Sequence, residues 1–143
     1  MKFNIKMDDK VIHDAAALVE EHYKDEKFLF KLGTIQKFNY AYDSGHDVRV
    51  KIFNSDIVMN IVPYKTKLPW SKAIGYASGD TIYVNTRKLD LPLADRVENF
   101  MHEPMHLLGY SHKGNYNNEF NRGTVPYRVA EIFRKYLESI GKL

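Results

Sequence analysis

The chain of 143 residues is long enough for one domain with a hydrophobic core, but not for two. Its formal net charge of +3, without a basic run that would follow a phosphate backbone, argues against nucleic-acid binding. Because it contains no cysteine, any metal ion must be held by histidine or carboxylate. We recognise no secretory signal and no membrane-spanning stretch, and therefore expect one cytoplasmic domain over residues 1–143, with no membrane partner.

The first half of the chain is predicted to contain one helix followed by three strands. Apolar residues at helical spacing predict a helix over residues 11–22, capped by one of the aspartates before it. Alternating apolar side chains predict strands at 34–42 and 48–52 with a turn between them. The nearly all-apolar segment 57–62 predicts a further strand, buried on both faces.

The second half is predicted to form a hairpin and two longer helices. Residues 73–77 and 81–85 flank a short turn, as in a β-hairpin. A helix is expected after Asp90, its plausible cap, then a loop over 113–123 and an amphipathic helix over 129–140. The order predicts an α/β fold: a mixed twisted sheet of about five strands with an N-terminal, an active-site and a C-terminal helix.

The most informative stretch reads H-E-x-x-H-x-x-G-x-x-H and begins at His102. His102 and His106 lie one helical turn apart and can coordinate one metal ion together. Gly109 can take the left-handed conformation that ends a helix, so that His112 can return as a third nitrogen ligand. The fourth tetrahedral position is then left for water, as in catalytic zinc sites. Glu103 points towards the same rim and can accept a proton from that water.

The apolar residues of this helix support metal binding over a role for the histidines in the core. In helical projection, one stripe of apolar side chains forms the predicted core face; it comprises Leu93, Val97, Phe100, Met101 and Leu108. The paired histidines fall on the opposite side, where histidines that merely fill a core are not expected.

The motif resembles that of the metzincin clan of zinc metallopeptidases. The specific match covers residues 102–112, and the remaining elements follow a compatible order. The resemblance implies an antiparallel edge strand beside the cleft, a place that the segment 73–77 occupies here. A peptide substrate would then lie antiparallel along that strand, against Gly75, Tyr76 and Ala77. Gly75 would either admit the substrate backbone or form a bulge.

Three features differ from the pattern of that clan. Val125 stands where the family has a methionine beneath the metal, although Tyr127 keeps the family's two-residue offset. By resemblance, Val125 would pack beneath the three imidazoles, and Tyr127 would donate a hydrogen bond to the oxyanion. Pro126 and Tyr127 would also line a pocket for a substrate side chain. The alternative for Tyr127 is a core aromatic. The short chain without a pro-segment fits a bacterial or phage-type intracellular relative. Pro104 either kinks the metal helix or disturbs the site.

The preferred prediction is an enzyme, a zinc-dependent endopeptidase acting on a peptide or protein substrate. Zn²⁺ would be held by His102, His106 and His112, with Glu103 as general base. One alternative is an amidase or cell-wall peptide hydrolase with the same site. Another is a non-catalytic, zinc-stabilised binding or virion structural module. A third keeps the peptidase chemistry but takes a carboxylate, from Glu119 or Glu131, as the third ligand.

Overall fold

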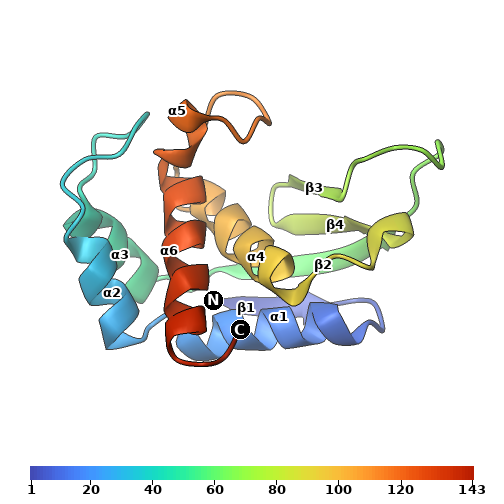
Figure 1. The fold of residues 1–143 in the computed structure, drawn as a ribbon, viewed down its shortest axis with the longest axis horizontal. Coiled ribbons are helices and arrows are strands. Elements are labelled where there is room, and N and C mark those ends of the chain that lie inside the picture. The colour runs from blue at the N-terminus through green and yellow to red at the C-terminus, as the bar shows by residue number, and fades with distance from the viewer.

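A four-stranded mixed sheet lies beside a group of helices in the computed structural model, which describes residues 1–143 (Figure 1). Its strands are β1 (Lys2–Ile5), β2 (Val58–Tyr64), β3 (Gly75–Ser78) and β4 (Thr81–Asn85). They lie in the order β1-β2-β4-β3, with β1 and β4 parallel to β2. Strand β3 pairs antiparallel with β4 and leaves its other edge free. A parallel pair needs a long crossover connection, and three helices supply it between β1 and β2.

The helices pack mainly against one another, with α4 in the middle of them (Figure 1). They are α1 (Lys10–His22), α2 (Glu26–Gly33), α3 (Gly45–Phe53), α4 (Leu93–Leu107), α5 (Glu119–Arg122) and α6 (Val125–Ser139), with a 3-10 turn η1 (Thr86–Lys88). Helix α4 packs against α1 and α6, and α2 packs against α3 and α6 (Figure 1). None of the helices combines the length and the apolar character that a membrane crossing requires.

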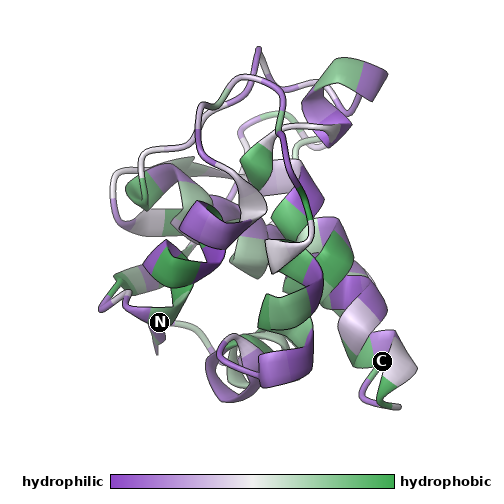
Figure 2. Cartoon of the chain, turned by 90° about the vertical axis from the view of Figure 1, so that its left-hand side faces the viewer, coloured by the Kyte–Doolittle hydropathy of each residue, from purple (hydrophilic) through white to green (hydrophobic).

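One cluster of 28 buried apolar residues forms the core between the sheet and the helices. The predicted apolar stripe of α4 faces this core, where Val97, Phe100 and Met101 are buried. The centroid of the Phe100 ring lies 5.6 Å from that of Phe3 on β1. Figure 2 shows α6, which leads to the C-terminus, with an apolar side and a polar side. Because α4 buries one side completely, its histidine-bearing side is left facing the cleft.

Two strands predicted in the first half of the chain are wrong. The segment predicted as a strand at 48–52 belongs to helix α3, and the segment at 34–42 contains only an isolated bridge between Asn39 and Thr124. Helix α3 begins with a capping box, in which Ser44 and Asp47 bond each other's backbone N–H groups. Three apolar residues at i, i+2 spacing can also occur in a helix. The capping box therefore determines that this segment is helical.

The sheet therefore has four strands instead of about five, and its edge strand β1 was not predicted. Helix α2 was also missed. In β2, Met59 and Ile61 are buried while Val58 is exposed, so this strand is covered on one face only. Asp90 does not cap α4, whose N-cap position is Pro92.

The loop predicted at 113–123 is wrong in part, because it contains the short helix α5. The other predicted elements are confirmed. Asp9 caps α1 by accepting a hydrogen bond of 3.0 Å from the Ile12 N–H. The hairpin of β3 and β4, the helix α4 that carries the histidine motif, and the closing helix α6 all form. The mixed α/β class is thus as predicted, and these are the elements that surround the histidine motif.

Candidate metal centre

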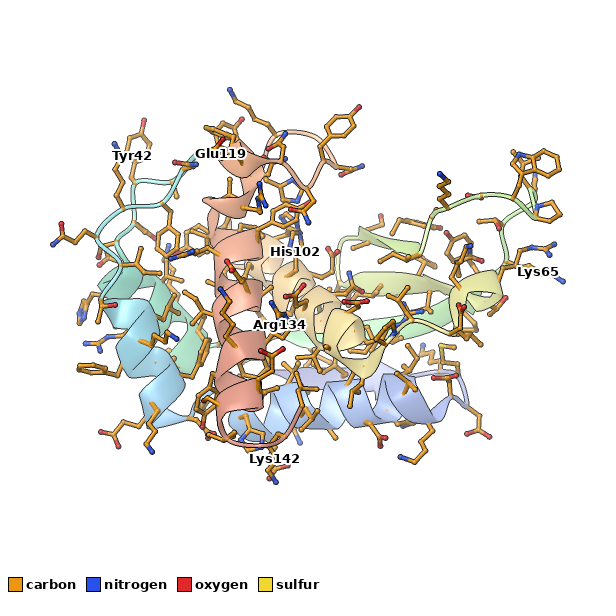
Figure 3. All side chains as sticks on the ribbon, in the orientation of Figure 1. Tyr42, Lys65, His102, Glu119, Arg134 and Lys142 are labelled. Atoms are coloured by element: carbon orange, nitrogen blue, oxygen red, sulfur yellow. The ribbon has the colours of Figure 1, made fainter.

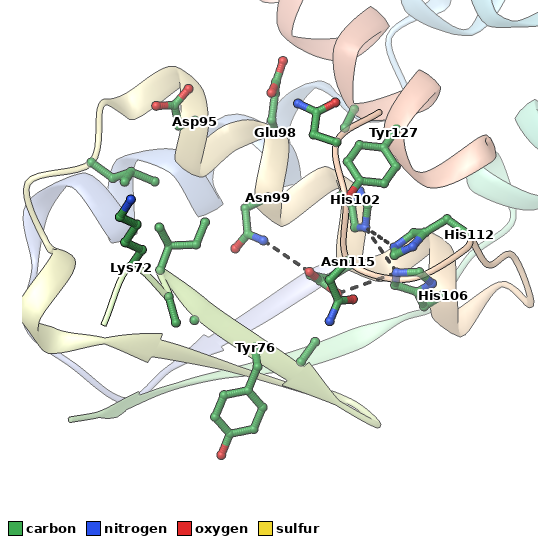
Figure 4. Close-up of a pocket in the computed structure, with 18 of the residues that line it drawn as sticks. Lys72, Tyr76, Asp95, Glu98, Asn99, His102, His106, His112, Asn115 and Tyr127 are labelled. Atoms are coloured by element: carbon green, nitrogen blue, oxygen red, sulfur yellow. Dashed lines mark hydrogen bonds and ion pairs between the residues drawn. The ribbon is translucent and has the colours of Figure 1, made fainter. Parts of the chain in front are cut away.

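The three histidines of the motif bring their Nε2 atoms together at one side of a cleft (Figure 4). The Nε2 atom of His102 lies 3.1 Å from that of His112 and 3.2 Å from that of His106. Three nitrogens bound to one zinc ion at about 2.0–2.1 Å in a tetrahedron would be about 3.3–3.4 Å apart. The observed spacing therefore fits one small cation.

Hydrogen bonds fix the tautomers of two of these imidazoles. The Nδ1 atom of His106 lies 2.8 Å from the Tyr110 carbonyl oxygen, and that of His112 lies 2.6 Å from the Gly114 carbonyl oxygen. A carbonyl can only accept, so each Nδ1 carries the proton and each Nε2 keeps its lone pair. Burial, followed by the two neighbouring imidazoles, lowers the pKa of His102 to about 3 and keeps it neutral. Three imidazole nitrogens facing one point form a set that can hold a metal ion.

The turn that returns His112 is the one predicted from Gly109. The Gly109 N–H donates to the His106 carbonyl at 3.0 Å, and the Tyr110 N–H donates to the Met105 carbonyl at 3.1 Å. These are the two bonds of a Schellman motif. Gly109 has φ +97, a left-handed value that favours glycine.

Glu103 lies beside the imidazoles with its side chain only 15% exposed. Its Oε1 accepts a hydrogen bond of 3.2 Å from Asn99, and its Oε2 is 4.0 Å from the Nε2 atom of His106. Burial raises the pKa of Glu103, although the charge of His112 and the bond from Asn99 act in the opposite direction. Helix α4 continues through the buried Pro104 to Leu107, so this proline does not end the helix before the second histidine.

Tyr127 lies on the first turn of α6, with its ring against two of the imidazoles. Its ring centroid is 4.6 Å from that of His102 and 5.0 Å from that of His112. It is partly exposed and lines the cleft, where Figure 4 shows it beside His102, so it is not one of the core aromatics. Val125 belongs to the core cluster. Pro126 is buried in the helix and does not line the cleft, so the predicted wall contains Tyr127 without Pro126.

The edge strand β3 forms the opposite wall of the cleft, as predicted. Gly75, Tyr76 and Ala77 all line it. The Tyr76 side chain, however, points away from the histidines (Figure 4) and stacks on Tyr83 at 4.6 Å. A Cβ on Gly75 would lie 2.3 Å from the Tyr83 carbonyl oxygen, and no bulge interrupts the pairing of Gly75 with Val84. The neighbouring strand is therefore sufficient reason for glycine at this position.

Three asparagines that the sequence reasoning missed organise the cleft. The buried Asn85 donates to the Ala73 carbonyl at 2.7 Å and so holds the segment leading into β3. The buried Asn121 donates to the Lys113 carbonyl at 2.6 Å and so holds the loop that follows His112. Asn99 has a sequence signal, since it precedes Glu103 by four residues on a helix. The other two bond segments eight or more residues away, which no helical or strand periodicity reveals.

The carboxylates considered as third ligands lie outside the histidine group. Only His102, His106 and His112 come close enough together to share one ion. Glu131 pairs with Lys135 and Arg128 on α6, while Glu119 begins the short helix α5.

No protein-family model matches this chain, and the searches of curated proteins and of solved structures found no match.

Proposed function

We propose that this protein is a zinc-dependent endopeptidase of the metzincin type. The observation that carries the proposal is the convergence of three imidazoles in a cleft wall, with the largely buried carboxylate of Glu103 beside them. Structural zinc sites are closed by four protein ligands, whereas catalytic sites keep one position open. Here the chain supplies three donors in one group, which supports a catalytic site over a structural one.

A zinc ion held by the three imidazoles would polarise the scissile carbonyl and lower the pKa of its water towards about 7. Glu103 takes the proton of the attacking water at a carboxylate oxygen and delivers it to the leaving amine. The raised pKa of Glu103 favours the uptake of the proton, because burial disfavours the charged carboxylate. Tyr127 donates a hydrogen bond to the tetrahedral oxyanion.

The free edge of β3 supports a peptide as the substrate. Its backbone N–H and C=O groups on that side have no partner strand, and they lie across the cleft from the histidines. An extended peptide can add to such an edge as a further strand. The scissile bond would then lie between β3 and α4, within reach of Glu103.

Metal analysis together with a peptide-cleavage profile tests the proposal. The protein is purified, its metal content is measured by elemental analysis, and it is incubated with a proteome-derived peptide library with and without a chelator. We expect about one zinc ion per chain and cleavage that stops with the chelator and returns on adding zinc. Cleavage of peptidoglycan fragments in place of peptides would instead identify the amidase alternative. Bound zinc without turnover of either substrate would identify the non-catalytic one.

A further inference from the structure

The loop between β2 and β3 carries an exposed apolar tip. Leu68 and Trp70 are 53% and 75% exposed, and Pro69 between them is also exposed. A tight turn sets this geometry, since the Ser71 N–H donates to the Leu68 carbonyl at 3.1 Å with proline at the second turn position. Trp70 contacts no other aromatic ring in the structure. Exposed apolar side chains gathered at the tip of a loop can form an interaction site.

The loop stands at one end of the molecule and is tied down at its base. Figure 1 shows it extending beyond the sheet, at the opposite end from α2 and α3, and Figure 3 places Lys65 on it. The Arg87 Nε–H donates to the Thr66 carbonyl at 3.1 Å. The tip is therefore held away from the rest of the surface and can reach a flat partner.

Positive charge surrounds the tip. Residues 57–89 contain five lysines and arginines against the single acid Asp80, so this segment carries more charge (+4) than the whole chain (+3). Lys65, Lys67 and Lys72 are all exposed and form no ion pair, even though Asp95 lines the same cleft as Lys72. Asp80 precedes β4 and Arg87 follows it, so the acid lies at the far end of that strand.

We propose that this loop, residues 65–74, docks the protein on an anionic lipid surface. Leucine, proline and tryptophan would enter the boundary between headgroups and acyl chains, while the three lysines remain at the level of the lipid phosphates. Tryptophan is favoured at this depth because its ring is apolar and its N–H is polar. Single-stranded nucleic acid fits the loop less well, because it is bound by cations along a groove and by stacked aromatic rings. Two of the three tip residues are aliphatic.

Docking of this kind requires no membrane-spanning segment, but it replaces the sequence-based expectation that the protein has no membrane partner. It does not depend on the proposed peptidase activity. The two are related in space, however, because Lys72, Ala73 and Ile74 of the same loop line the cleft. A docked loop would hold the cleft next to the lipid surface, where substrates at that surface would be favoured.

The chain contains its own reporter, since Trp70 is its only tryptophan. The full-length protein is titrated with vesicles of phosphatidylcholine alone and of phosphatidylcholine mixed with phosphatidylglycerol. We expect a blue shift of the tryptophan emission and protection from iodide quenching with the anionic vesicles only. Unchanged emission with both kinds of vesicle would overturn the proposal.

Loop variants and matched controls locate the contact. Changing Lys65, Lys67 and Lys72 to glutamine should weaken vesicle binding at least tenfold, since each lysine near an anionic surface contributes about fivefold. Changing Leu68 and Trp70 to serine should abolish co-sedimentation with the vesicles. Two control variants change the other end of the molecule. The first removes the same charge by changing Lys27, Lys31 and Lys37 to glutamine, and the second removes an exposed apolar side chain by changing Phe30 to serine.

Both sets of variants change exposed side chains, and thermal melts by circular dichroism confirm that they fold. If the controls reduced binding as much as the loop variants do, the assignment of the contact to this loop would be wrong. If an oligonucleotide quenched the tryptophan emission and anionic vesicles did not change it, the partner of the loop would be nucleic acid and the lipid proposal would be wrong.

Discussion

The Tyr110 hydroxyl donates a hydrogen bond of 2.6 Å to the Oδ2 atom of Asp43, which lies 67 residues earlier in the chain. The same oxygen accepts a bond of 2.7 Å from Lys51 on α3. The carbonyl of Tyr110 meanwhile accepts from Nδ1 of His106. One tyrosine thus connects the orientation of a predicted metal ligand to the segment before α3, and both ends of this connection can be tested.

Replacing Asp43 with asparagine should destabilise the protein at neutral pH and flatten its response to acid. Bonds from Lys51 and then Tyr110 lower the pKa of Asp43 in the folded state. Since the unfolded value is about 3.9, the unfolded chain binds more protons in acid. The stabilisation is complete above that value and is lost as the pH falls through the lower folded pKa. Urea unfolding at neutral and acid pH measures this, with Asp8→Asn as the control; equal acid slopes in wild type and Asp43→Asn would contradict it.

Replacing His112 with alanine should sharply lower the zinc content while the fold largely survives. His112 follows the Gly109 turn on a partly exposed loop, so its removal leaves the core untouched. Elemental analysis and circular dichroism give the two readouts, and His46→Ala serves as a control outside the histidine group. Unchanged zinc stoichiometry would rule out the three-histidine assignment.

Replacing Glu103 with glutamine should leave zinc binding normal and reduce turnover at least about a hundredfold. Glutamine keeps the size of the side chain and can still bond Asn99, but it cannot take up a proton at neutral pH. The measurement is the rate of cleavage of a peptide identified in the library. A rate close to that of the wild type would remove Glu103 from the mechanism.

Replacing Pro104 with leucine should stabilise the protein by up to about 3 kcal/mol, because α4 runs through this position and a leucine restores a backbone donor. Side-by-side thermal melts measure the effect. Because Pro104 is buried, the larger leucine side chain could itself destabilise the protein. The smaller variant Pro104→Ala therefore measures the effect of the backbone alone. Loss of stability in both variants would mean that the helix is built around the proline.

Replacing Tyr127 with phenylalanine should reduce turnover about tenfold or more, since one lost oxyanion donor costs about 10²–10³ in rate. The phenyl ring can keep the packing against His102 and His112, so folding and zinc content should not change. Kinetics, thermal melts and elemental analysis together decide the role. A variant with wild-type turnover would assign Tyr127 a packing role only.

The parts of the site that could be predicted from the sequence are local ones. The helical pair of histidines, the Gly109 turn and Glu103 lie within one short stretch, where spacing alone determines geometry. The hairpin and α6 were predictable for the same reason. The apolar stripe on α4 was also correct, since helical periodicity and burial agree there.

The errors arose where tertiary contacts or caps decide the structure. Val48, Val50 and Ile52 alternate like a strand, but the capping box of Ser44 with Asp47 starts a helix there. Strand β1 is fixed by pairing with β2, more than fifty residues later, which the short segment does not reveal. Asn85 and Asn121 act through backbone carbonyls of other loops.

All three residues of the histidine group come from one stretch of eleven residues. The donors therefore remain close neighbours along the chain even after the protein unfolds. A denatured chain of this kind retains appreciable affinity for zinc, and an ion stabilises the folded state only by the difference between its affinities for the two states. We therefore expect zinc to raise the melting temperature by less than its affinity for the native protein alone would indicate.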